Sequence, residues 1–122
     1  MVFDVCAFVG HWPGVAISAD AAQVRDALRR EGVERMLLSP LDAAWALDPH
    51  RTNAVVYEAA ARWDDVLPAP VLDPTVATWR AELRRARESG APAARLLPTY
   101  SPYDLEDADD LLGALAEAGM AA

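Results

Sequence analysis

The chain has 122 residues, a net charge of −8 and 53% hydrophobic residues. This length fits one domain of ordinary size, and the acidic balance argues against sequence-independent nucleic-acid binding, which relies on basic patches. No apolar run approaches the roughly 18 residues of a membrane span, and no secretory signal opens the chain. We therefore expect a cytoplasmic protein that binds neither nucleic acid nor membrane. The single cysteine, Cys6, excludes an internal disulfide and a Cys-rich zinc site.

Four apolar, strand-like runs follow one another at similar spacing. They begin near Val2, Arg35, Val66 and Ala93, and an amphipathic stretch follows each. Strands that alternate with helices predict parallel pairing with right-handed crossovers. Because a complete eightfold barrel takes roughly 250 residues, we predict an α/β fold in which residues 1–122 form a partial (β/α)8 TIM barrel. The chain would be a single incomplete domain, the N-terminal half of such a barrel.

The first unit is predicted as a buried strand, a turn and a helix. Residues 2–9 are mostly apolar on both faces, as in a parallel strand that is covered on both sides. The segment 10–14 is predicted as a turn. Asp20 and Gln23 have the spacing of a capping box at the start of the helix, and Gly32 is expected to end it.

The second and third units repeat this plan. A strand over 33–38 is followed by one ambiguous segment, 41–47, and by Asp48-Pro49, which has the form of a helix cap with proline in the first turn. The third strand, over 66–72, holds two prolines whose missing amide hydrogens fall toward the same neighbour, so we expect one thin ladder. Asp73-Pro74 is predicted to start the third helix.

The fourth unit has a predicted strand over 93–97, a loop over 98–106 and a last helix capped by Asp107. The final residues, 120–122, are too short to form a strand. Strands one and four would remain open edges unless another chain or a missing half covers them. Proteins normally protect such unpaired edges.

Four segments carry a resemblance to a known family. They are residues 3–13, Asn53 with the helix after it, residues 67–74 and residues 95–107. In order, they resemble the first strand, the second helix, the third strand, and the fourth strand with its exit loop of the amidohydrolase-related proteins, which include metal-dependent hydrolases and decarboxylases. The resemblance implies hydrolysis or decarboxylation of a small carboxylate-bearing substrate, with this fragment inactive by itself.

The resemblance also shows what differs. Family members that use a metal carry two histidines spaced by one residue on strand one, because a strand's period of two aims both side chains at one ion. Cys6 and Phe8 occupy those positions here. A divalent, zinc-like metal is thus implied for full-length relatives, while we expect no metal ligand and no cofactor in this fragment. Some relatives that resemble lactonases work without a metal, so hydrolysis stays open.

In an eight-stranded α/β barrel the chemistry lies at the carboxyl ends of the strands. Four residues there are candidate substrate-binding residues: His11, Trp12, Arg95 and Tyr100. His11 suits a general base or substrate donor, or a hydrogen bond within its own loop. Trp12 and Tyr100 suit a pocket wall or a loop anchor.

Arg95 places a guanidinium in an apolar strand, where it must find a carboxylate, an anion or solvent. At the barrel mouth it would hold a substrate carboxylate bidentately. In the lumen it would pair with Asp4 or another carboxylate. No catalytic residue is assigned. His50 is expected to be exposed, and Glu82 is placed on a solvated, arginine-rich helix face.

Two other classes of function compete with a hydrolase. One is a non-catalytic binding or scaffold module that forms a homodimer, strand four of each copy pairing with strand one of the other. The other is a free-standing doubly wound domain that binds a small ligand at its strand ends. Helices on both faces of the sheet would favour the doubly wound domain, and helices on one face would favour the barrel fragment.

Overall fold

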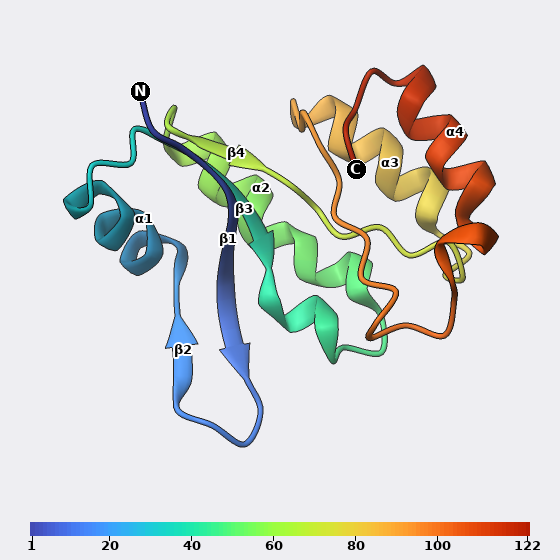
Figure 1. The fold of residues 1–122 in the computed structure, drawn as a ribbon, viewed down its shortest axis with the longest axis horizontal. Coiled ribbons are helices and arrows are strands. Elements are labelled where there is room, and N and C mark those ends of the chain that lie inside the picture. The colour runs from blue at the N-terminus through green and yellow to red at the C-terminus, as the bar shows by residue number, and fades with distance from the viewer.

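The computed structural model describes all residues, Met1–Ala122, as a mixed α/β fold with an open sheet (Figure 1). The strands are β1 (Phe3–Trp12), β2 (Ile17–Ala19), β3 (Arg35–Pro40) and β4 (Val66–Pro68). The α-helices are α1 (Ala21–Arg30), α2 (Ala54–Arg62), α3 (Trp79–Glu88) and α4 (Asp109–Glu117), and shorter 3₁₀ helices cover Leu41–Ala44, Pro49–Asn53 and Leu105–Ala108. None of the helices combines the length and the apolar character that crossing a bilayer requires.

The strand order is β2-β1-β3-β4, and the prediction of an all-parallel sheet is wrong at one edge. β1 pairs with β3, and β3 with β4, in parallel as predicted. However, β1 continues to Trp12, where a turn was expected, and the chain reverses at Pro13-Gly14 so that β2 pairs antiparallel with β1. Gly14 has a φ of 80°, a left-handed conformation that glycine adopts at little cost. A hairpin therefore precedes the first crossover helix.

The third predicted strand, over 66–72, is regular only as β4. On one side, the N–H of Ala69 donates to the Leu38 carbonyl of β3 at 2.8 Å. Alternation along the strand then directs the amide positions of Pro68 and Pro70 to the opposite neighbour, where proline has no N–H to donate. The expected thin ladder is confirmed on that side.

The fourth predicted strand, over 93–97, is not a regular strand, because it forms only isolated parallel bridges. Arg95 bridges Val71, and Ala93 bridges Ala121. The C-terminal residues, expected to be too short for a strand, thus add one more parallel pairing. From β1 onward, the parallel pairings follow chain order.

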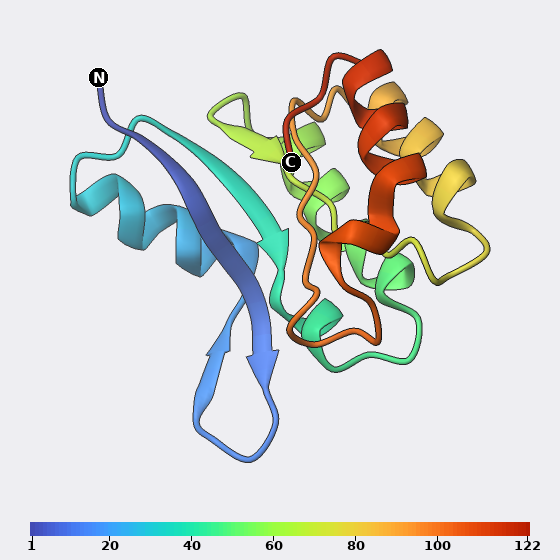
Figure 2. The ribbon, with the colours of Figure 1, turned by 45° about the vertical axis from the view of Figure 1, so that its right-hand side comes forward.

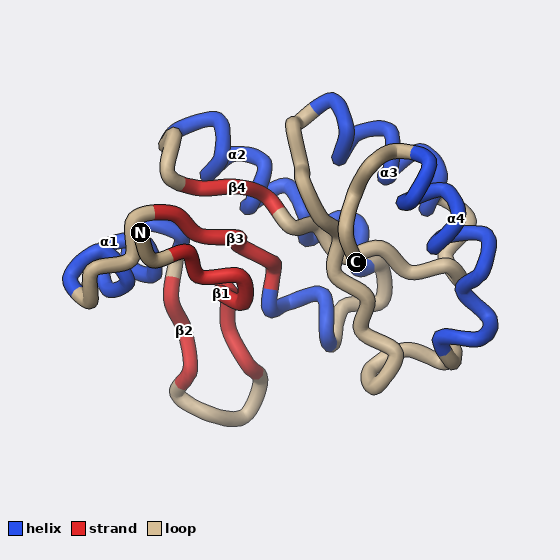
Figure 3. The backbone as a smooth tube through the Cα atoms, turned by 45° about the horizontal axis from the view of Figure 1, so that its top comes forward, coloured by secondary structure: helices blue, strands red, loops and turns tan.

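All four α-helices pack on the same side of the sheet. Val9 of β1 and Val66 of β4 meet α1 and α2 in one hydrophobic cluster. Leu72 lies an even number of residues after Val66, hence on the same face, and joins α3 and α4 in a second cluster with Leu111. Figure 3 shows the helices following one another around the outside of the strands, and Figure 2 shows the turned view. The opposite, inner face of the strands is called the concave face below.

Two predicted helix starts are confirmed. Asp20 and Gln23 form the capping box, with the N–H of Gln23 donating to Asp20 Oδ1 at 2.8 Å and the N–H of Asp20 donating to Gln23 Oε1 at 2.9 Å. Asp48 accepts the N–H of His50 at 3.1 Å, and Pro49 opens the 3₁₀ helix before α2. In both motifs the capping side chain and its backbone partner are only two or three residues apart.

The other two predicted starts are wrong. Asp73 accepts the N–H of Thr75 at 2.8 Å within a turn, and α3 begins only at Trp79. In the last unit the capping residue is Asp104, with Asp107 as its partner in the box rather than the cap. A 3₁₀ turn therefore precedes α4.

Candidate functional site

His11 and Asp42 meet at the carboxyl ends of β1 and β3. The backbone N–H of His11 donates to Asp42 Oδ1 at 2.8 Å, and His11 Nδ1 lies 3.8 Å from the same oxygen. Trp45 donates its indole N–H to the His11 carbonyl at 3.0 Å. Gly10 permits this packing, because a Cβ there would collide with the Asp42 carboxylate. The His11 side chain remains 49% exposed, so its backbone is anchored while its imidazole stays accessible.

Trp12 and Tyr100 lie in contact although they are far apart in the sequence. Their rings pack edge to face with centroids 5.7 Å apart. Trp12 ends β1, and Tyr100 belongs to the loop after the fourth pairing segment, so this contact joins the first strand to the last exit loop. Tyr100 is 56% exposed, which leaves one side of the aromatic pair open to solvent.

Arg95 crosses the concave face. Its Nη2 donates to the Val5 carbonyl at 2.8 Å, its Nε donates to Ser39 Oγ at 3.3 Å, and its guanidinium lies 5.4 Å from the centroid of the Phe8 ring. No carboxylate of the chain forms an ion pair with it. The expected lumen partner, Asp4, instead accepts the N–H of Cys6 at 2.8 Å.

One feature of β3 and one of β1 orient the Arg95 side chain. Ser39 is completely buried and donates its hydroxyl hydrogen to the Ala69 carbonyl at 2.8 Å, so its oxygen lone pairs are left for the guanidinium. The register of β1 shifts between Asp4 and Ala7, as at a bulge, and the Val5 carbonyl that Arg95 uses lies within this shift. Bulges commonly redirect groups in this way.

A buried polar network lies behind the strands, and the sequence did not single it out. Asn53, which is completely buried, donates to the Val71 carbonyl at 2.9 Å and accepts the Val71 N–H at 2.8 Å. It also donates to Glu82 Oε1 at 3.0 Å, and Tyr57 donates its hydroxyl to the same oxygen at 2.8 Å. Glu82 is 8% exposed, so its placement on a solvated face is wrong. Burial, and then the bond to Glu82, raise the pKa of Tyr57.

His50 belongs to the same region, and its expected exposure is wrong, because it is only 4% exposed. Its Nε2 accepts the N–H of Asp73 at 3.0 Å, and its Nδ1 lies 2.9 Å from Thr78 Oγ1. An accepting Nε2 requires the neutral ring, and burial lowers the pKa of His50 accordingly. One side of the second helical segment carries three of these polar residues at helical spacing, His50, Asn53 and Tyr57. This spacing is the sequence signal from which the buried network could have been predicted.

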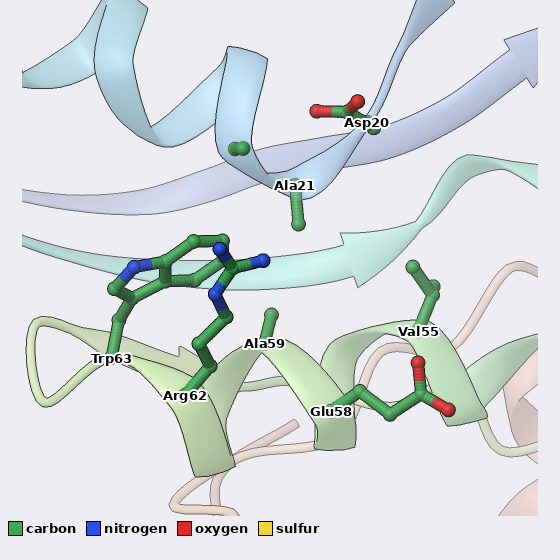
Figure 4. A pocket seen from close by; sticks show the side chains of 8 residues that line it. Asp20, Ala21, Val55, Glu58, Ala59, Arg62 and Trp63 are labelled. Carbon is green, nitrogen blue, oxygen red and sulfur yellow. The ribbon is translucent and has the colours of Figure 1, made fainter.

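Two hollows open beside these groups. One, of ≈ 340 Å³, lies at the carboxyl ends of β1 and β3, with Asp42, Arg51 and Glu58 among its lining residues. The other, of ≈ 360 Å³, is a groove between α1 and α2, where Arg62 lies beside Trp63 (Figure 4). Of these two hollows the first adjoins the candidate site, since Gly10 and Asp42 line it, but none of His11, Trp12, Arg95 and Tyr100 lines either hollow.

The side chains present do not fit a metal centre. No group of three or more His, Cys, Asp or Glu side chains lies close enough together to hold an ion. Phe8, whose side chain cannot bind a metal ion, lies beside the Arg95 guanidinium. No family model, curated protein or solved structure matches the chain.

Proposed function

We propose that the chain is part of a barrel of the amidohydrolase-related type, and that its concave face binds a small carboxylate-bearing molecule through Arg95. The observation that carries this proposal is a guanidinium held by neutral groups alone, without any carboxylate partner. A partly desolvated charge needs an anion or solvent. Ser39 and Val5 occupy only Nε and one position on Nη2, so Nη1 is left to donate charge-assisted hydrogen bonds to a carboxylate.

Two observations support the barrel. The helices pack on one face of the sheet, and the parallel pairings from β1 onward follow chain order. A flat sheet would separate β1 from the 93–95 segment by three strand spacings, roughly 14 Å. An extended arginine side chain spans only roughly 7 Å with standard bond lengths. The hydrogen bond from Arg95 to Val5 therefore favours a sheet that curls toward its concave face, as barrel strands do.

The reaction, hydrolysis or decarboxylation, rests on the family resemblance. In this proposal the accessible imidazole of His11 serves as a base or as a donor to the substrate, and Asp42 fixes the backbone that carries it. No step through a metal is derived, since the residues present do not fit one. We further propose that this chain alone does not turn substrate over, because Cys6 and Phe8 replace the strand-one histidines.

Titration of the isotope-labelled protein with acetate, succinate and benzoate, followed by NMR, tests the binding proposal. We expect saturable shifts of the Arg95 Nε–H and of the amides of Val5 and Ser39. Arg95→Met should weaken binding on the order of tenfold or more, as loss of a charge-assisted pair does, and Arg95→Lys should restore it only in part. Arg87→Met, which removes an exposed arginine of α3, is the matched control. Equal binding by the Arg95→Met variant would contradict the proposal.

Turnover is measured separately, with a panel of esters, lactones and amides in the presence and absence of divalent metals. We expect none from the purified chain. Metal-dependent turnover would show that this chain is catalytic by itself, while carboxylate binding without turnover also fits the binding-module alternative. The NMR titration therefore tests carboxylate binding, and the turnover assay tests catalysis independently of it.

A further inference from the structure

We propose that the outer edge of β1 is an interface with a second copy of this chain, in which two β1 strands pair antiparallel around a two-fold axis. This inference does not rest on the carboxylate site, although Val5, whose carbonyl accepts from Arg95, belongs to both. On its outer side β1 is paired with β2 only over Gly10–Trp12, and residues 3–9 have no strand partner there. Such an unpaired edge is a template for another strand. Two identical edges meet in a closed, self-complementary contact when a two-fold axis relates them.

Exposed apolar side chains are concentrated along this edge. Within the open stretch Phe3 is 42% exposed and Val5 is 57% exposed, and Val2 just before it is 55% exposed. A single exposed apolar residue is ordinary, whereas a run of them beside an open strand edge is typical of an interface. Pairing the edge would bury these side chains together with the backbone groups that have no strand partner, and the Cys6 N–H, which donates to Asp4 Oδ1 in one copy, would exchange that acceptor for the second strand.

The distribution of charge favours a second copy as the partner. Asp4 has the only charged side chain among residues 1–19, although the side chains of the whole chain sum to −8. Two acidic copies therefore repel each other least when they approach through this edge. A basic partner would instead be attracted to the acidic remainder of the surface.

Helix α1 extends the same surface. None of its residues is buried, and its inward side chains Val24 and Leu28 are only partly covered by the neighbouring cluster. Antiparallel pairing of two β1 strands makes one continuous sheet and places both α1 helices on its same side. The apolar stripe of each helix then gains cover that one copy does not provide.

The single cysteine reports this arrangement. Cys6 is exposed and free, and it lies at the middle of the open stretch 3–9. Antiparallel pairing centred there brings the two Cys6 Cα atoms to roughly 4.5–5.5 Å, which is within the range that a disulfide bridges. The alternative in which strand four of one copy meets strand one of the other would separate the two thiols.

The first test is the molar mass of the full chain, measured by light scattering over a concentration series in reducing buffer. We expect a discrete dimer, and we expect Val5→Lys to raise its dissociation constant on the order of tenfold or more, because a charge on the edge opposes strand pairing. Val15→Lys is the matched control, since Val15 is 55% exposed but lies in the hairpin turn. Circular dichroism verifies that each variant is folded. A monomer at every concentration, or a dimer that Val5→Lys leaves intact, would overturn the proposal.

The second test is made on the native chain, with disulfide formation as the readout. Mild oxidation with diamide in dilute solution should join the native chain into a covalent dimer through Cys6, and Cys6→Ser should prevent this. In the control, Cys6→Ser is combined with Ser89→Cys, which places the only thiol at the exposed end of α3. Cross-linking of this control to the same yield would mean random collision, and failure of the native chain to cross-link would exclude pairing centred on Cys6. Either result contradicts the proposed interface.

Discussion

Asn53 takes the place of a neighbouring strand for Val71. Its side-chain amide accepts the Val71 N–H at 2.8 Å and donates to the Val71 carbonyl at 2.9 Å, so both backbone groups of a buried residue are satisfied. His50 likewise accepts the N–H of Asp73. Side chains from the second helical segment thus supply partners on the β3 side of residues 71–73, beyond the point where β3 pairs with β4. Removing either one would leave buried backbone groups unpaired.

The neutral state of His50 gives the fold a pH dependence. Burial lowers the pKa of His50 from its ordinary value of 6.5, although the carboxylates of Glu82, Asp48 and Asp73 partly oppose this. Below about 6.5 the unfolded chain therefore binds more protons than the fold does, and the free energy of unfolding falls as the pH falls. Urea denaturation at about pH 7.5 and about pH 5.5 should show this loss.

His50→Gln should flatten that dependence, because an amide provides a donor and an acceptor without titrating in this range. The matched control is His11→Gln, which removes the other histidine, and it should retain the wild-type pH dependence. If His50→Gln lost stability between the two pH values as the wild type does, the neutral histidine would not be its source.

Helix α1 is held by its ends and by an ion pair more than by its inner face. No α1 residue is buried. Arg25 Nε donates to Asp65 Oδ1 at 2.8 Å, which ties the helix to the turn before β4 and lowers the pKa of Asp65. Trp63 lies under the Arg25 guanidinium, 5.3 Å from it. With so little packing, the helix depends on its capping box.

Asp20→Ala should therefore destabilise helix α1 by about 1 kcal/mol, a usual cost for a lost cap. Because the effect is local, amide hydrogen exchange should accelerate in α1 and stay unchanged in α3. Asp26→Ala, which removes an exposed carboxylate of the same helix, should change stability by less than about 0.5 kcal/mol. Equal acceleration in both helices would show that the cap acts on global unfolding instead.

The capping motifs also show what the sequence can and cannot predict. Asp20 and its partner are three residues apart, so the motif forms regardless of the rest of the fold. Asp73-Pro74 has the same local form as Asp48-Pro49, yet the N–H of Asp73 donates to His50 from a distant segment, and α3 begins only at Trp79. Strand β2 is only three residues long and depends on pairing with β1, which local patterns do not reveal.

The candidate site, too, could be predicted only in part from the sequence. Parallel strands place their carboxyl ends together, and this rule was enough to nominate His11, Trp12, Arg95 and Tyr100. The contact of Trp12 with Tyr100 joins opposite ends of the chain, and so does the hydrogen bond from Arg95 to Val5. Both depend on how the whole sheet curves, which no short segment determines.

At the scale of the whole molecule, the Arg95 side chain bridges the concave face of the sheet. It reaches from the 93–95 segment to β1 and contacts β3 on the way, through Ser39. The helices on the outside and this side chain on the inside favour the same direction of curvature. Because this bridge is a single side chain, its contribution to the curvature of the sheet can be tested with one substitution.

Arg95→Met keeps the apolar stem but removes the hydrogen bonds to Val5 and Ser39, so the concave face should open. Spin labels at Val15→Cys and Leu105→Cys, in a Cys6→Ser background and diluted with unlabelled protein, would measure the span between the hairpin and the segment before α4 by pulsed electron resonance. Both labelled positions are exposed, at 55% and 53%. We expect a longer and broader distance distribution in Arg95→Met, and an unchanged one in the control Arg87→Met. An unchanged span in Arg95→Met would mean that helix packing alone sets the curvature, and Arg95 would then be free to serve a bound anion without any mechanical role.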